Sequence, residues 1–287
     1  MTPMKNLRII YDNAADRATL AASPVAAALA AANLQSDIKT DIYRSTGTRA
    51  TFVLSWPVAE RIGCVAFPFS NLTSGGAVRV RLYAMPGDSA PVLDTGWVLA
   101  CAPAPFAPRD FGILPLAFNA YRWGGVSTWG NGGGAAAVTW FAPARGRRMV
   151  IDLDDARNPQ GYIEAGRLVA GDYWSPQCNA DFGAGLQNQD SSVHFRNETG
   201  DLLTQKGSTS NKLTLQLSHL QSDDRMRLAR ILRDNGKHTP MLVSLFPENP
   251  DPVLEQEYTL YGKASNLAAV TTPYFGTYAF PLEIEGI

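Results

Sequence analysis

The chain has 287 residues, enough for two domains of ordinary size that each bury a core of their own. Charged residues make up 18% and apolar residues 45%, with glycine and proline plentiful, which predicts a folded, turn-rich and mainly β protein. The formal net charge is −1 and the 25 lysines and arginines are scattered, which excludes a nucleic-acid footprint. Neither a secretory signal nor an apolar stretch long enough to insert into a membrane is present.

Short strands with glycine and proline between them dominate the chain up to Leu168, and this pattern predicts a β-sandwich. The expected strands cover residues 7–11, 50–54, 62–67, 78–83, 137–141, 149–153 and 162–168.

Residues 147–168 give the clearest pattern within this block. Met149, Ile151 and Leu153 share one face of an alternating strand, and a turn follows at residues 158–161. Apolar alternation then resumes at Tyr162, so the segment is predicted to form the closing hairpin of the sandwich.

A long irregular insertion, about residues 97–136, interrupts the block and is rich in aromatic residues, glycine and proline. Its candidate binding residues, for subunit or glycan contact, are Tyr121, Arg122, Trp123 and Trp129, because aromatic rings beside an arginine suit both protein hot spots and sugar faces. The alternative is that these rings only cap the open end of the sandwich.

The character of the chain changes after Leu168, which places a domain boundary between residues 1–168 and 169–287. Residues 212–217 alternate as an amphipathic strand, and a helix is predicted at about 222–235 with Ser222 as its N-cap and Gly236 just past its end. Strands follow at 240–246, 257–263 and 278–285, so this block is predicted to be a β-sandwich-like domain carrying one α-helix.

The sequence offers little catalytic chemistry. His194, His219 and His238 are far apart and belong to no metal or hydrolase motif, and three distant cysteines fit neither a disulfide framework nor a zinc site. Gly130–Ala137 lacks the lysine and hydroxyl ending of a phosphate loop. No carboxylate pair stands out for glycoside hydrolysis. We therefore predict a protein that is not an enzyme, with no cofactor, no catalytic residue and no bound metal.

Several short motifs occur in an order that resembles galactose-binding-like (discoidin-type) jelly rolls: Tyr11–Asp16, Asn33-Leu34, Tyr43–Ser45 and Val78–Tyr83. More narrowly they resemble the version found in tail-tip and baseplate proteins of tailed bacteriophages, although Tyr43 stands where that version usually has tryptophan. The later order of strand, capped helix, Met241–Phe246 and Tyr278–Glu285 resembles the C-terminal part of distal-tail proteins. Some galactose-binding-like domains hold a structural calcium ion. The acidic run of Asp152, Asp154 and Asp155 lacks calcium-loop spacing, so a solvated turn is the default interpretation.

These resemblances imply a structural component of a siphovirus-like tail tip or baseplate. Such a component would be made in the host cytoplasm and carried in the virion at the distal end of the tail. Its partners would be further copies of itself in a ring-like homo-oligomer, together with tube, hub, fibre or receptor-binding proteins of the tail. The alternative is a carbohydrate-binding module that contacts host surface glycans, and a glycoside hydrolase is the third possibility.

Overall fold

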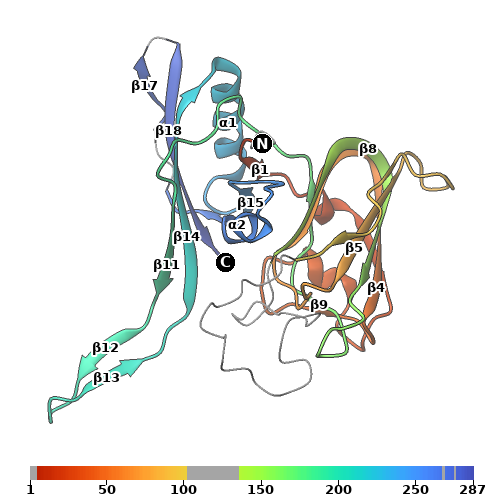
Figure 1. Cartoon of the computed structure of the whole chain (residues 1–287), viewed down its shortest axis with the longest axis horizontal. Coiled ribbons are helices and arrows are strands. Elements are labelled where there is room, and N and C mark those ends of the chain that lie inside the picture. The colour runs from red at the N-terminus through yellow and green to blue at the C-terminus, as the bar shows by residue number, and fades with distance from the viewer. Residues whose placement is uncertain (1–4, 102–135, 267–268, 275) are drawn as a thin grey trace.

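The computed structural model describes residues 5–101, 136–266, 269–274 and 276–287. The fold is mainly β, as predicted, and its two large sheets lie side by side in Figure 1. The predicted binding residues Tyr121, Arg122, Trp123 and Trp129 lie outside the described residues. In the described part of the chain, no helix is long and apolar enough to cross a membrane.

The first sheet belongs to the N-terminal sandwich and runs in the order β10-β4-β8-β5-β6, with β2 paired to β4 and β7 to β5. Its strands are β2 (Thr19–Ser23), β4 (Arg49–Phe67), β5 (Ala77–Tyr83), β6 (Leu93–Asp94), β7 (Val98–Leu99), β8 (Ala137–Asp154) and β10 (Val169–Gly171). Two 3-10 helices, η1 (Ala14–Arg17) and η2 (Ala31–Gln35), and a small sheet of β3 (Tyr43–Arg44) with β9 (Glu164–Ala165) complete it.

The sandwich is formed by one sheet that folds over on itself, because two of its strands are long and bent. The predicted strands 50–54 and 62–67 are one strand, β4, and 137–141 and 149–153 are one strand, β8. The pairing of β4 with β8 shifts register between Ser55 and Glu60 and again between Ile62 and Cys64. Bulges of this kind bend a strand and increase its twist, and Figure 1 shows β8 curving over the top of the sandwich.

Alternation along these strands builds the core. Phe52, Leu54 and Trp56 are buried from β4, and Met149, Ile151 and Leu153 are buried from β8, as the period of two requires. Phe52 packs edge-on against Tyr43 with ring centroids 4.9 Å apart. The Tyr43 hydroxyl donates a hydrogen bond of 2.6 Å to the Pro24 carbonyl, so the ring is buried without losing its polar partner.

The predicted closing hairpin of residues 147–168 is wrong in its pairing. The turn exists: the Gly161 amide donates to the Asn158 carbonyl at 3.1 Å, and Gly161 has a φ of +75°. The two flanking strands, however, do not pair with each other, because β8 lies between β4 and β5 whereas β9 pairs with β3. Sequence alternation assigns faces to a strand but does not identify its neighbour.

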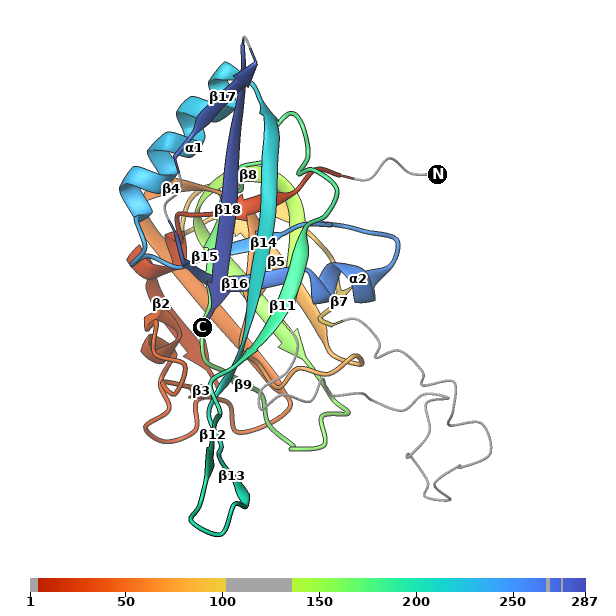
Figure 2. The same ribbon diagram turned by 90° about the vertical axis from the view of Figure 1, so that its left-hand side faces the viewer.

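The second sheet runs in the order β1-β15-β16-β18-β14-β11, with β17 paired to β18. Its strands are β1 (Arg8–Ile10), β11 (Gly185–Asp190), β14 (Thr209–Leu220), β15 (Met241–Ser244), β16 (Thr259–Ala264), β17 (Thr271–Tyr274) and β18 (Thr277–Gly286). A separate hairpin of β12 (Val193–Arg196) and β13 (Leu202–Gln205) continues from β11 and β14 and projects away from the body in Figures 1 and 2.

Helix α1 (Ser222–Asn235) forms where the sequence predicts it, with Leu228 and Ile231 on its buried face. Gly236 has the expected positive φ, at +54°. The predicted cap is wrong: Gln221 occupies the N-cap position without a side-chain bond, and Ser222 is already the first helical residue. Asp224 in the first turn accepts the Gln177 amide at 2.9 Å, and its charge favours the positive end of the helix dipole.

A second helix, α2 (Pro252–Glu257), was not predicted. Asp251 caps it by accepting from the amides of Val253 and Leu254, and Pro252 occupies the first position.

The two sheets meet at a shared apolar cluster that includes Ile10, Cys64, Val169, Leu242 and Tyr261. Strand β1 pairs with β15 across more than two hundred residues of chain, and β10 pairs with β4 of the sandwich. Strand β1, which precedes the predicted boundary between residues 168 and 169, thus belongs to the second sheet, and β10, which follows the boundary, belongs to the first. The division into domains 1–168 and 169–287 remains a proposal.

Candidate functional site

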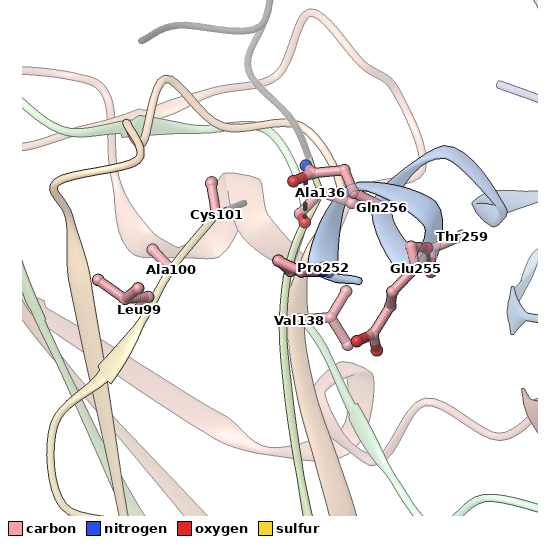
Figure 3. A pocket seen from close by; sticks show the side chains of 9 residues that line it. All are labelled: Leu99, Ala100, Cys101, Ala136, Val138, Pro252, Glu255, Gln256 and Thr259. Carbon is pink, nitrogen blue, oxygen red and sulfur yellow. Dashed lines mark hydrogen bonds between the residues drawn. The ribbon is translucent and has the colours of Figure 1, made fainter. Parts of the chain in front are cut away.

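A cavity of about 150 Å³ lies between the end of β7, the start of β8 and helix α2 (Figure 3). Its lining comes from the end of β7, the start of β8, helix α2 and the first residue of β16. It consists of Leu99, Ala100, Cys101, Ala136, Val138, Pro252, Glu255, Gln256 and Thr259.

The chemistry of this cavity is limited by its two ionisable groups. Burial raises the pKa of Cys101 to about 12, so the thiolate that a nucleophile requires is not formed near neutral pH. Burial also raises the pKa of Glu255, whose carboxylate accepts a 2.8 Å hydrogen bond from the Trp140 indole. Glu255 is the one carboxylate in the described lining, whereas glycoside hydrolysis needs two.

A second candidate lies at the loop end of the sandwich, near β3 and β9. We call Arg44, Asn71, Gln160, Tyr162 and Glu164 the loop-end cluster. The Arg44 guanidinium lies 4.4 Å from the centroid of the Tyr162 ring and bonds to the Glu164 carboxylate at 2.6 Å. The Asn71 amide donates to the Gln160 side chain at 2.7 Å and to the Tyr162 carbonyl at 2.9 Å. The paired strands β3 and β9 and the loops that carry Asn71 and Tyr162 thus present a ring, an ion pair and two amides together.

A buried aspartate supports this cluster from beneath. Asp155 is fully buried and accepts the Thr73 amide at 2.9 Å and the Thr73 hydroxyl at 2.8 Å. It also accepts the Asn158 side-chain amide at 3.2 Å, and Asn158 in turn donates to the Asn71 carbonyl at 3.0 Å. The loops that carry Asn71 and Tyr162 are therefore tied to one carboxylate.

The other members of the acidic run are paired elsewhere. Asp152 accepts from Arg81 at 2.5 Å and from Thr51 at 2.8 Å, and Asp154 accepts from Arg49 at 2.9 Å. Among the described residues, no group of three or more histidines, cysteines, aspartates or glutamates could hold a metal ion.

The third candidate is the hairpin of β12 and β13, which we call the arm. The register places Val193, Phe195 and Leu203 on one face, and these side chains are 58%, 49% and 42% exposed. The opposite face carries Leu202 and a hydrogen bond of 2.8 Å between His194 and Thr204. An isolated two-stranded hairpin is only marginally stable in water. The exposed apolar face of the arm is therefore a candidate contact surface for another protein chain.

Sequence reasoning missed the arm, α2 and the loop-end cluster. The alternation of Val193 and Phe195 indicates a strand, and Asp251 followed by Pro252 is a helix start. The loop-end cluster has no such local signal, because Arg44 and Asn71 are far along the chain from Gln160, Tyr162 and Glu164. The pairing of β3 with β9 and the hydrogen bonds of Asn71 bring them together.

No protein-family model matches the chain, and no curated protein matches it. Solved structures do resemble it. A CBM32 module from Clostridium perfringens, in complex with GalNAc-β-1,3-galactose, is 8% identical, covers 56% of this chain and 100% of its own, and has a TM-score of 0.35. A chitosan-binding module of a chitosanase/glucanase from Paenibacillus sp. IK-5 is 12% identical, covers 56% of this chain and 99% of its own, and has a TM-score of 0.36.

A GH29 fucosidase from Ruminococcus gnavus, in complex with fucose, is 12% identical and matches over 58% of this chain but only 27% of its own, with a TM-score of 0.35. None of the three structures is a phage protein, and two are carbohydrate-binding modules. With TM-scores below 0.5 these likenesses carry no argument about this chain, and its function has to be argued from its own residues.

Proposed function

We propose that the chain is a non-catalytic carbohydrate-binding protein and that the loop-end cluster is its binding surface. The observation that carries the proposal is the convergence of Tyr162, the Arg44–Glu164 pair and the Asn71 and Gln160 amides. Sugar hydroxyls both donate and accept, so they match a carboxylate beside a guanidinium and amides beside a ring. The Tyr162 ring offers the apolar surface on which a sugar face packs.

Pre-organisation favours this assignment over a chance polar surface. The Asp155 network fixes the loops before any ligand arrives, which lowers the entropy that binding must overcome. The small cavity at Glu255 supplies one carboxylate and an unreactive thiol, so it does not support the hydrolase alternative.

The test is a glycan array probed with the whole chain, followed by titration of the bound glycan. We expect Tyr162→Ala and Arg44→Ala each to weaken binding by about tenfold or more, because each removes a ring or charged donor from the contact. Arg61→Ala is the matched control, since Arg61 is an exposed arginine on β4, outside the loop-end cluster, with a single carboxylate contact to Asp172 at 3.5 Å.

Binding to no glycan on the array would overturn the proposal. Binding that Tyr162→Ala leaves intact but Trp123→Ala abolishes would move the site to the aromatic insertion.

The arm favours a second candidate function, that of a structural subunit. Its apolar face has no cover within the described chain, and β11 is an edge strand at the end of its sheet. A self-assembling tail-tip component, as the resemblance to distal-tail proteins implies, would cover both. This candidate places the protein at the distal end of a phage tail, in contact with further copies of itself and with other tail proteins.

Sedimentation of the purified chain tests this second candidate. We expect an oligomer that Phe195→Ser dissociates and that Phe182→Ser does not, because Phe182 is fully exposed outside the arm. A wild-type monomer would contradict self-assembly. Antibody labelling confined to the distal end of phage-like particles would support the tail location.

A further inference from the structure

A polar cleft of about 550 Å³ lies at the junction of the two sheets, between η1, the turn after η2 and the C-terminal end of α1. Its volume is within the range of small-molecule sites, roughly 300–1,000 Å³. The lining residues are Tyr11, Asp12, Asn13, Asp16, Arg17, Asp37, Arg167, Arg230, Asp234, Asn235, Thr239 and Pro240. None of them belongs to the loop-end cluster or the arm.

A buried arginine, Arg167, lies at the bottom of this cleft. The Arg167 side chain is only 3% exposed, and it donates to Asp16 at 2.7 Å and lies 3.1 Å from an Asp37 oxygen. The Arg167 Nε donates to the Tyr261 hydroxyl at 2.9 Å. The opposing carboxylates are therefore fixed in position, and the sandwich is bonded to the second sheet at this point.

The two walls are also fixed. The Asn13 side-chain amide donates to Asp16 at 3.0 Å and to the Leu168 carbonyl at 3.0 Å on one side. The Asn235 amide at the end of α1 donates to the Tyr11 carbonyl at 2.6 Å on the other. The cleft is thus preformed rather than a gap between loosely packed parts.

The cleft is lined by charged side chains of both signs, and they are paired with one another. Four aspartates face three arginines, so the formal charge of the lining is −1, and each carboxylate has a guanidinium nearby. The carboxylates of the lining would repel a phosphate, and its guanidinium groups would repel a metal ion. Among the described residues no acidic group of metal-binding geometry exists here. A neutral ligand with several hydroxyls fits better, because each hydroxyl can donate to a carboxylate and accept from a guanidinium.

We infer that this junction cleft binds a neutral polyhydroxylated ligand, of the size of a monosaccharide or disaccharide. Asp234 and Arg230 on α1, together with the Thr239 hydroxyl, supply the hydrogen bonds on the exposed side of the cleft. Tyr11 also lines the cleft, and its backbone carbonyl is already held by the Asn235 side chain. The ligand would touch both the sandwich and the second sheet, so its binding stabilises their contact.

Saturation-transfer NMR on the full chain tests the inference, with the methyl glycosides of galactose, glucose and mannose as probes. We expect transfer to at least one probe. Asp234→Ala and Arg230→Ala should each weaken that binding by about tenfold, because each removes a charged hydrogen-bonding partner. Arg227→Ala is the matched control: Arg227 is an exposed arginine of the same helix and is absent from the lining.

The outcomes separate this site from the loop-end cluster. Transfer that is lost in Asp234→Ala and kept in Tyr162→Ala and Arg227→Ala supports the cleft. Transfer that Tyr162→Ala abolishes and both α1 variants leave unchanged overturns the cleft while sustaining the proposed function. If none of the three probes shows saturation transfer, the proposal that the cleft binds such a ligand is wrong. Unchanged melting temperatures of the two α1 variants show that lost binding is not lost folding.

Discussion

Replacing Asp155 by alanine should destabilise the sandwich far more than replacing its neighbour Asp154. Asp155 is fully buried and accepts from the Thr73 amide, the Thr73 hydroxyl and the Asn158 side chain. The alanine leaves the buried Thr73 amide without an acceptor and weakens the other two contacts. A buried donor left unpaired costs about 1–3 kcal/mol, so we expect a total loss of about 3 kcal/mol.

Asp154, the last residue of β8 and the neighbour of Asp155 in sequence, provides the matched control. Its partner Arg49 has a side chain that is 77% exposed, and an exposed ion pair of this kind contributes about 1 kcal/mol or less. Asp155→Asn keeps one acceptor oxygen and should fall between the two alanine variants.

Thermal unfolding followed by tryptophan fluorescence measures the difference. For a domain of this size about 3 kcal/mol lowers the melting temperature by about 6–12 °C, whereas Asp154→Ala should lower it by about 4 °C or less. Equal shifts in the two alanine variants would refute the argument, because they would mean that the buried network contributes no more than a surface pair. The loops that Asp155 ties together carry Asn71 and Tyr162, so Asp155→Ala should also weaken any glycan binding at the loop-end cluster.

Two further predictions concern ionisable groups. Burial raises the pKa of Glu255 above its ordinary value, so its contribution to stability is fully present below the unfolded pKa and is lost as pH rises through the folded pKa. The melting temperature of Glu255→Gln should therefore rise relative to that of the unchanged protein as pH increases above the ordinary glutamate pKa of 4.5, and a difference that stays constant with pH would contradict the assignment. Cys178 is half-buried, whereas Cys64 and Cys101 are buried with raised pKa values. A thiol reagent should label Cys178 first in the native protein, and rapid labelling of all three would show that the cavity at Cys101 admits solvent.

Local patterns in the sequence predict much of the fold. The alternation in β4, β8 and β14 and the amphipathic period of α1 are properties of single elements, and the structure confirms them. Pairing is not a local property. The sequence around residues 147–168 indicates two strands joined by a turn, yet β9 pairs with β3, and nothing near Glu164 identifies Tyr43 and Arg44 as its partners.

The candidate sites show the same limit more strongly. The predicted binding residues Tyr121, Arg122, Trp123 and Trp129 share one short segment, because a cluster along the chain is what a sequence displays. The loop-end cluster and the junction cleft are each assembled from distant segments. Their members become recognisable only when Arg44 lies against Tyr162 and when Arg167 lies between Asp16 and Asp37.

Because strand β1 belongs to the second sheet, the N-terminal sandwich has the topology of a domain inserted into the C-terminal one. The chain lays down one strand of the second sheet, builds the whole sandwich and then returns. The points of departure and return are adjacent: the Ile9 amide donates to the Trp174 carbonyl at 2.8 Å, and the Trp174 amide donates to the Ile9 carbonyl at 2.8 Å.

A segment whose two ends meet in this way can be exchanged for another without disturbing the sheet that receives it. The second sheet, α1 and the arm could thus remain constant while the inserted module changes between relatives. The proposed glycan-binding surface and the proposed assembly arm would then vary independently within one polypeptide.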